Sequence, residues 1–315
     1  MEEIIEIQQC LYNNKLDLLP CFCSDYSVLI DEIVFAPSIR PFLINDIVDW
    51  CVKHKDSFPD GFKCYLLKAG LRNCPSLVRK LMQKGYFCAD EILDRLSYIR
   101  IRGLCFYFFE IINDYAGFVK NFRYKYSKYG FESFPVEEEK ESNSFLLDYG
   151  FPKNSIEYAL KYDDSSILNV YESDPSFSYS SNIKWSQFEW AFEPYSMDPL
   201  SVSAFFGSVK CFKRIMILSS ATMASTMYCA LCGGNIDIVS MISENHYIQK
   251  EAIDITIKYC QEVLFDWLCS NTTLSTICAS ESHCIKCYQF LIGNGMDKNS
   301  GFNVFCLYKL LLNIF

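Results

Sequence analysis

The 315-residue chain is poor in the residues that build tight turns, with only 13 glycines and 10 prolines. Sandwiches and barrels need many such turns, so this scarcity favours helices. Long apolar runs are missing as well. The two longest, 104–118 and 302–315, contain charged residues and fall short of the roughly 18–20 residues that span a bilayer. We therefore expect an all-helical protein without a membrane-spanning segment.

Histidine is scarce too, and His54, His246 and His283 are its only occurrences. None of the three lies beside a serine or cysteine in a known nucleophile motif. No glycine-rich loop precedes a Lys-Ser or Lys-Thr pair, so a phosphate-binding loop is missing. These absences predict a protein with no catalytic residues, no metal and no cofactor.

Basic residues are fewer than acidic ones: the chain has 29 lysines and arginines and 38 aspartates and glutamates, which gives a net charge of −9. Proteins that bind nucleic acid usually carry a basic stripe that neutralises phosphates. The best basic cluster is Arg123, Lys125 and Lys128, and the acidic run Glu137–Glu139 follows it closely. We interpret this cluster as a solvated helix face and expect no nucleic-acid partner.

The N-terminus does not resemble a secretory signal, because Met1-Glu2-Glu3 is acidic and no apolar stretch follows it. The 17 cysteines are an odd number, so at least one thiol stays unpaired. We expect reduced, buried cysteines that act as small apolar residues in a cytoplasmic protein.

What the chain does contain is an internal repeat, clearest at residues 198–216. Pro199 is expected in the first turn of a helix, where its missing N–H costs nothing. Gly207 is expected to end that helix in the left-handed conformation. Cys211, Phe212 and Ile215 then follow at helical spacing and form the inner stripe of a second helix.

A second copy occupies residues 230–242, where Gly234 takes the place of Gly207 at a separation of 27 residues (207 to 234). Its inner stripe consists of Ile238, Val239 and Ile242. Weaker copies share this spacing. They are 156–171 with a turn at Asp163-Asp164, 253–268 with a turn at Cys260 and a stripe of Leu264, Phe265 and Leu268, 278–291, and 60–90 with Gly85 at its end.

These copies resemble the ankyrin repeat: a Pro-Leu opening, a glycine between two helices, an apolar second helix, and a Gly-containing closure at 291–299. Together with 185–190, the segment 203–212 looks like a large, divergent ankyrin family of parasitic protists. The resemblance covers 155–300 and, less closely, 60–90. Ser201 departs from the family's turn histidine, which removes a side-chain hydrogen bond, and glycine is missing at the turns near Cys260 and His283.

The predicted fold is an all-α solenoid of stacked, ankyrin-like helix-turn-helix repeats with a more irregular N-terminal part. We expect four regions: an N-terminal helical region at 1–135, an acidic and polar linker at 136–148, the repeat array at 149–300, and an apolar capping helix at 301–315. Residues 174–194 are too polar and aromatic for one helix and predict a long inserted loop or finger.

Two Cys-x-x-Cys pairs, Cys229/Cys232 and Cys284/Cys287, raise an alternative function that depends on metal or thiols. A zinc ribbon separates such pairs by about 15–20 residues. Here a complete repeat lies between them, and Cys287 belongs to the apolar stripe of its own repeat. Packing is therefore the favoured interpretation, and no metal ligand is assigned.

The resemblance implies a non-enzymatic scaffold that binds another protein on the concave face formed by finger tips and first helices. The candidate surface comprises the loops 193–198, 221–225 and 245–250. The candidate partner-binding residues are Trp190, Tyr195, Met197, Thr222, His246 and Tyr247. The aromatic residues of 185–195 have a second interpretation, which we favour: they seal the apolar face of the repeat that begins at Asp198. The net acidity favours a basic partner. A further alternative makes the repeats a targeting module for an effector region at 1–135.

Overall fold

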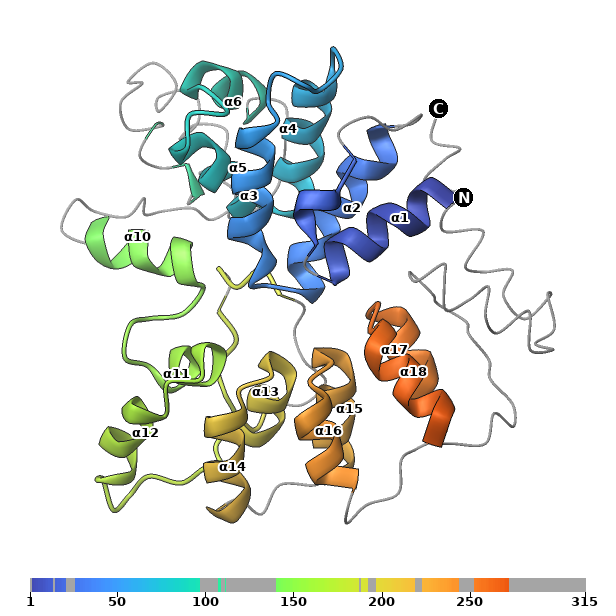
Figure 1. The fold of residues 1–315 in the computed structure, drawn as a ribbon. Coiled ribbons are helices and arrows are strands. Elements are labelled where there is room, and N and C mark those ends of the chain that lie inside the picture. Colours follow the sequence, from blue (N-terminus) through green and yellow to red (C-terminus); the bar gives the residue numbers. More distant parts are fainter. Residues whose placement is uncertain are drawn as a thin grey trace, which may run out of the picture. The chain divides into compact units, whose positions relative to one another are not determined.

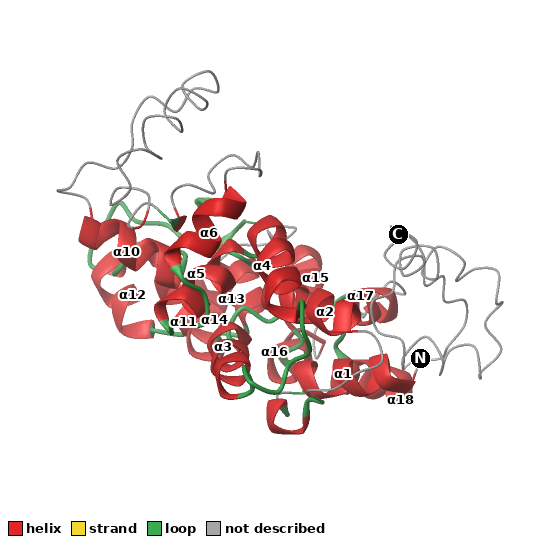
Figure 2. Ribbon diagram, turned by 90° about the horizontal axis from the view of Figure 1, so that it is seen from above, coloured by secondary structure: helices red, strands yellow, loops and turns green. Residues whose placement is uncertain are grey.

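The computed structural model of the chain describes residues 2–13, 15–20, 26–96, 107–108, 111, 140–186, 188–191, 197–218, 223–243 and 252–271. Within these ranges all regular elements are helices and no strand occurs (Figure 2). The all-helical class expected from the sequence is therefore confirmed. The expected capping helix at 301–315 and the weak repeat at 278–291 lie outside the described residues.

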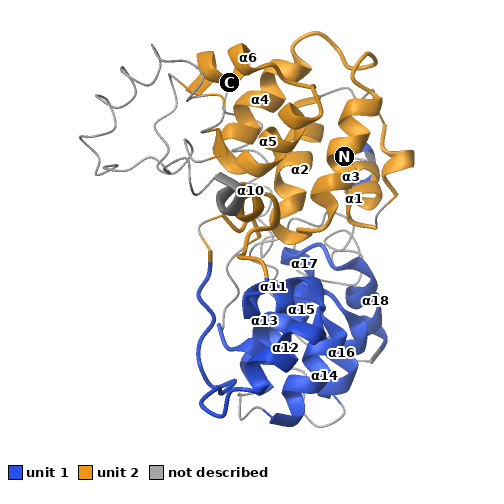
Figure 3. Ribbon diagram, turned by 90° about the vertical axis from the view of Figure 1, so that its left-hand side faces the viewer, with its two compact units in different colours: residues 1–5, 154–185, 193–315 blue, residues 6–153, 186–192 orange. Residues whose placement is uncertain are grey.

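The helices follow one another through two compact units (Figures 1 and 3). In chain order they are α1 (Glu2–Tyr12), the short 3-10 helix η1 (Leu16–Leu18), α2 (Tyr26–Ile39), α3 (Leu43–Lys53), α4 (Phe62–Asn73), α5 (Pro75–Gln83), α6 (Ala89–Leu96), α10 (Lys140–Tyr149), α11 (Ile156–Tyr162), α12 (Ser165–Glu172), α13 (Pro199–Phe206), α14 (Val209–Leu218), α15 (Met223–Gly233), α16 (Ile236–Ser243), α17 (Ala252–Lys258) and α18 (Glu262–Asn271). Unit 2 comprises 6–153 and 186–192, and unit 1 comprises 1–5, 154–185 and 193–315.

The described part of unit 1 contains four consecutive helical pairs: pair 1 (α11 and α12), pair 2 (α13 and α14), pair 3 (α15 and α16) and pair 4 (α17 and α18). The first helices pack in chain order, α11 on α13, α13 on α15 and α15 on α17. The second helices do the same from α12 to α14 to α16. A short helix cannot bury an apolar face alone, so this stacking provides the continuous core.

The stripes expected on the second helices are the buried ones. Cys211, Phe212 and Ile215 of α14, then Ile238, Val239 and Ile242 of α16, and then Leu264, Phe265 and Leu268 of α18 are all at most 2% exposed. In α12 only Leu168 is buried, while Ile167 and Tyr171 are half-buried. The helical period of the sequence was therefore sufficient to identify the core of pairs 2 to 4.

Unit 2 contains pairs that stack in the same order. The first helices α2, α4 and α6 pack in sequence, and the second helices α3, α5 and α10 form the neighbouring row. Gly70 of α4 allows close approach, since a Cβ there would meet the side chain of Val78 in α5. The sequence indicated only the pair at 60–90, so the pair formed by α2 and α3 is a finding of the structure.

The segment expected to be a linker, 136–148, is helical from Lys140 onward, because α10 runs to Tyr149. The loop prediction was wrong for this part. Within this helix Leu147 is 2% exposed. The buried guanidinium of Arg79 in α5 donates to Asp148 at 3.2 Å and to Ser144 at 3.5 Å. The polar segment that suggested a linker is therefore mostly helical, and an ion pair anchors this helix to α5.

Candidate interaction surface

Each helical pair of unit 1 turns at one residue with a positive φ. These residues are Asp163 (54°), Gly207 (71°), Gly234 (74°) and Cys260 (51°), at separations of 44, 27 and 26 residues (163 to 207, 207 to 234, 234 to 260). The left-handed conformation ends a helix and lets the backbone satisfy its last carbonyls. The backbone N–H of Asp164, Ser208 and Gln261 accordingly donates to a carbonyl five residues earlier. The turns expected at Asp163, Gly207, Gly234 and Cys260 are confirmed, and the turn expected near His283 lies outside the described residues.

The residues after the left-handed positions Gly207, Gly234 and Cys260 form a polar ladder between successive pairs, which sequence reasoning missed. The Ser208 hydroxyl donates to the carbonyl of Leu160 in pair 1. The Asn235 amide donates to the carbonyl of Gly207 in pair 2 at 3.3 Å. A signal for this ladder exists, because polar residues recur immediately after the turns.

The last rung of the polar ladder joins pairs 3 and 4. The Gln261 amide donates to the carbonyl of Cys232 at 2.5 Å. Each rung satisfies a carbonyl at the C-terminal end of a first helix, which has no partner within that helix. The polar ladder therefore fixes the register of each pair against the pair before it.

Pair 1 also caps the second helix of pair 2. The Asp163 carboxylate accepts from the backbone N–H of Lys210 at 3.2 Å and of Cys211 at 2.9 Å, both in the first turn of α14. An acid at a helix N-terminus satisfies free N–H groups and complements the helix dipole. Asp163 is thus a turn residue of one pair and a cap for the next.

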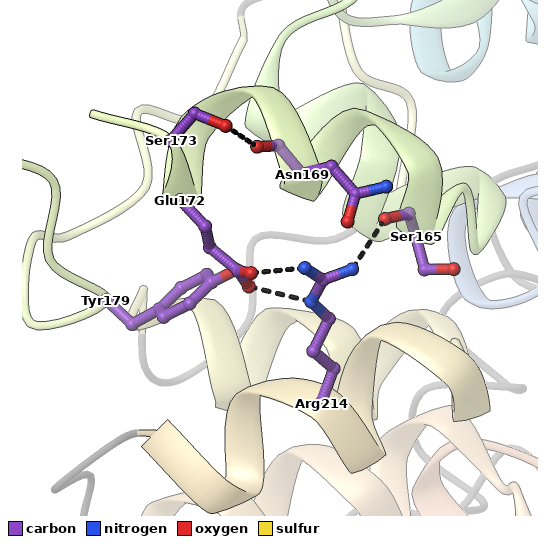
Figure 4. A network of polar contacts seen from close by, with 6 residues as sticks. All are labelled: Ser165, Asn169, Glu172, Ser173, Tyr179 and Arg214. Atoms are coloured by element: carbon purple, nitrogen blue, oxygen red, sulfur yellow. Dashed lines mark hydrogen bonds and ion pairs between the residues drawn. The ribbon is translucent and has the colours of Figure 1, made fainter. Parts of the chain in front are cut away.

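The stretch 173–185 lengthens the connection between pairs 1 and 2. It corresponds to the first part of the inserted loop that we expected at 174–194. A network holds it against α12 and α14 (Figure 4). The Arg214 guanidinium donates through Nε to Glu172 at 2.7 Å, through Nη2 to the same carboxylate, and through Nη1 to the carbonyl of Ser165. The Tyr179 hydroxyl donates to Glu172 at 2.7 Å. Arg214 therefore joins α14 to α12, and Tyr179 attaches the insert to the same Glu172 carboxylate.

The electrostatics of this network follow from the same contacts. The hydrogen bond from Arg214 holds the pKa of the Glu172 carboxyl below its ordinary value. That bond in turn raises the pKa of Arg214. Burial, followed by the nearby carboxylate, raises the pKa of Tyr179. All three groups thus keep their usual charge at neutral pH, which marks a structural clamp and gives no group poised for proton transfer.

The aromatic residues of 185–190 are packed in the structure. The Trp185 ring stacks on Phe206, with ring centroids 5.8 Å apart, and meets Phe205 edge-on at 6.3 Å. Trp185 therefore covers the end of α13, as the sealing interpretation expected, whereas Phe188 contacts Tyr107 within unit 2. Trp190 is half-buried and its indole N–H donates to the carbonyl of Pro41 at 3.1 Å.

Among the six candidate partner-binding residues, the structure describes two. Trp190 belongs to unit 2, and Met197 belongs to unit 1, where its carbonyl accepts from the N–H of Ile183 at 2.6 Å. Both are half-buried. The other four, Tyr195, Thr222, His246 and Tyr247, lie outside the described residues.

The described cysteines form no disulfide and are mostly buried. Cys229 and Cys232 of the first Cys-x-x-Cys pair are at most 3% exposed. Burial raises the pKa of the Cys232 thiol, and it raises that of Cys211 to about 12. A thiol is a metal ligand or nucleophile only as thiolate, so these groups suit packing. Cys284 and Cys287 lie outside the described residues, and within the described ones no three His, Cys, Asp or Glu residues are grouped to hold a metal.

The first and second helices of unit 1 differ in exposure. All eight residues of α13 are buried, and most of α15 and α17 is buried as well. The second helices expose an outward row at positions 3, 6, 7 and 10 after the left-handed turn residue, which share a face because they are spaced three or four apart. The large apolar side chains of this row that are exposed are Val170 (73%), Ile217 (81%) and Val263 (66%), with Leu218 (59%) next to Ile217.

Comparison of the chain with known protein families, with curated proteins and with solved structures gave no match. In the described part of the chain, no helix combines the length and apolar character needed to cross a membrane.

Proposed function

We propose that this protein is a non-enzymatic scaffold that binds another protein through an ankyrin-like array of stacked helical pairs. The observation that carries the proposal is the common register of the four left-handed turns, Asp163, Gly207, Gly234 and Cys260. Together with the polar ladder, this register supports a repeat array of the kind that the sequence resembles. Such arrays present extended surfaces to partners.

The burial pattern narrows where a partner could bind. Because α13 is entirely buried and most residues of α15 and α17 are buried, these three first helices offer little free surface. On that side, binding would depend on the loops that precede each pair, which include Met197 and the candidates Tyr195, His246 and Tyr247. The thiols fit this role in a cytoplasmic protein, since the described ones form no disulfide and most of them are buried.

The test is to find a partner and reconstitute the complex. Proteins captured from host-cell lysate by the full chain are purified singly, and binding is measured by calorimetry. A scaffold predicts a binary complex with a dissociation constant of roughly micromolar or tighter. The proposal fails if no purified protein binds.

A variant with Ala at Tyr195, His246 and Tyr247 then tests the loop side, and a matched control carries Ala at the exposed Leu18, Lys55 and Asp56 of unit 2. Loss of the complex in the first variant alone places the partner on the loops. The same protein is assayed for bound zinc. Stoichiometric zinc would instead favour the metal-dependent alternative.

A further inference from the structure

The outward row of second helices is not uniform along unit 1, and α14 differs most from its neighbours. On α14 the positions 3, 6, 7 and 10 after the turn are Lys210, Lys213, Arg214 and Ile217. The same positions are Ser166, Asn169, Val170 and Ser173 around α12, and they begin with Asp237, Ser240 and Met241 on α16. Cations therefore gather on one helix of the stack.

Two of these cations are left without a charge partner. Arg214 is neutralised by Glu172. Lys210 and Lys213 are exposed, and among the described residues no ion pair or side-chain hydrogen bond involves either amine. The chain as a whole carries a charge of −9, so two lysines without an ion pair on this helix are a local excess of positive charge. Long-range acidity thus favours basic partners, but α14 favours acidic groups.

Exposed apolar side chains accompany these cations. Ile217 and Leu218 are 81% and 59% exposed at the end of α14, and Val170 is 73% exposed on α12, which packs beside α14. A partner that covered only the lysines would leave this apolar surface exposed to water. A partner that covered only the apolar residues would have to desolvate nearby ammonium groups without replacing their hydration. The occupant must supply both carboxylates and apolar anchors.

We infer that the outward face of α14, with Val170 of α12, is a docking site for an acidic segment of a partner protein that carries one or two large apolar side chains. This inference rests on the proposed scaffold function and assigns its partner class and face. Carboxylates of the segment pair with Lys210 and Lys213, and its apolar side chains cover Val170, Ile217 and Leu218. The clamp between Arg214 and Glu172 holds α12 and α14 together, so the site exists before the partner arrives.

The test uses a display library of random 16-residue peptides selected against the full-length protein, because this probe does not presuppose the natural partner. We expect the enriched peptides to be acidic and to contain large apolar residues. The most enriched peptide is synthesised, and its affinity is measured by fluorescence anisotropy at two salt concentrations. Binding should weaken with salt, because exposed charge pairs are screened.

Variants then locate the bound peptide. The double variant Lys210→Glu, Lys213→Glu and the single variant Ile217→Ser should each lower affinity by about tenfold or more. Two matched controls should not change it: Val263→Ser, an exposed valine in the outward row of α18, and Lys68→Glu, an exposed lysine of unit 2. These positions are all exposed, so the variants are expected to fold.

Enrichment of neutral or basic peptides, no enrichment, or affinities indifferent to the α14 variants would overturn the inference. So would binding to anionic lipid vesicles that the same variants abolish, or self-association of the chain through this face. The proposed function is judged separately, since a reconstituted protein complex that tolerates the α14 variants would keep the scaffold and reject this docking site.

Discussion

Units 1 and 2 share a packing order and differ in how their helical pairs turn. In both, first helices stack on first helices and second on second. In unit 1 every pair turns through a left-handed residue, whereas α4 and α5 are joined by Cys74 alone, with a negative φ of −145°. Stacked helical pairs therefore do not require a left-handed turn. What unit 1 gains is a fixed place for the next residue, which forms the polar ladder.

The largest effect is expected from adding a Cβ at the turn residue Gly234, because a side chain of the polar ladder lies directly against it. A Cβ at Gly234 would overlap the side-chain amide of Gln261, while one at Gly85 of unit 2 meets nothing within 4 Å. Both glycines have a φ of 74°, so Gly→Ala imposes the same backbone strain at each. We expect Gly234→Ala to cost about 3 kcal/mol and Gly85→Ala about 1 kcal/mol in urea unfolding. Equal losses at the two sites would show that the polar ladder adds nothing.

Asp163 should give the next largest effect, because it is both turn and cap. Asp163→Ala puts a left-handed strain on alanine and removes the acceptor for two N–H groups of α14. We expect a loss of about 2 kcal/mol. Asp163→Asn keeps an acceptor and a residue that tolerates this conformation, so it should cost less than half as much. If both variants unfold at the same urea concentration as wild type, the cap is dispensable.

Removing one rung of the polar ladder should have a smaller effect. Gln261→Ala leaves the Cys232 carbonyl without its side-chain donor, at an expected cost of about 1 kcal/mol. The matched change in unit 2 is Gln83→Ala at the exposed end of α5, which should stay within about 0.5 kcal/mol of wild type. Thermal unfolding of both variants makes the comparison, and a loss at Gln83 as large as that at Gln261 would contradict it.

The smallest effect concerns pH and is confined to unit 1. The pKa of Glu172 is lower in the folded protein than in the unfolded chain, so its contribution to stability is present above the unfolded value. It is lost as pH falls through the folded value. Hydrogen exchange of α12 and α14 should therefore quicken below about pH 4.5 in wild type more than in Glu172→Gln. The amides of α4 serve as the internal reference, and an identical pH response of α12 in both proteins would exclude the clamp as its cause.

The sequence predicted the parts of this fold that are encoded locally. The turns at Gly207 and Gly234 and the stripes on α14, α16 and α18 follow from glycine placement and helical period, which act within about ten residues. The turn at Cys260 was also found, although cysteine has no preference for the left-handed conformation, because the spacing of Leu264 and Phe265 located it. Pair α2 and α3 was missed, since it has no left-handed glycine between its helices and α2 is apolar around most of its circumference.

Contacts between distant residues could not be predicted in the same way. The donors and acceptors of the polar ladder lie 28, 29 and 48 residues apart, and no local pattern connects them. Ser142, Asn143 and Ser144 suggested a linker, and Arg79, which anchors α10 through Ser144 and Asp148, lies far away in the sequence. The docking face proposed on α14 was missed for a related reason. Lys213 and Arg214 are adjacent and equally basic, and only the structure separates the paired cation from the unpaired one.

The polar ladder has a consequence for how such a chain can be rearranged. Its donors lengthen along unit 1, from the serine hydroxyl at 208 to the asparagine amide at 235 and the glutamine amide at 261. Each donor is matched in length to the carbonyl of its own predecessor. The pairs are therefore not interchangeable modules. In a shuffled chain that placed pair 2 after pair 3, a serine would replace the glutamine that reaches the carbonyl of pair 3. The contacts between successive pairs therefore determine the order of the pairs in the array.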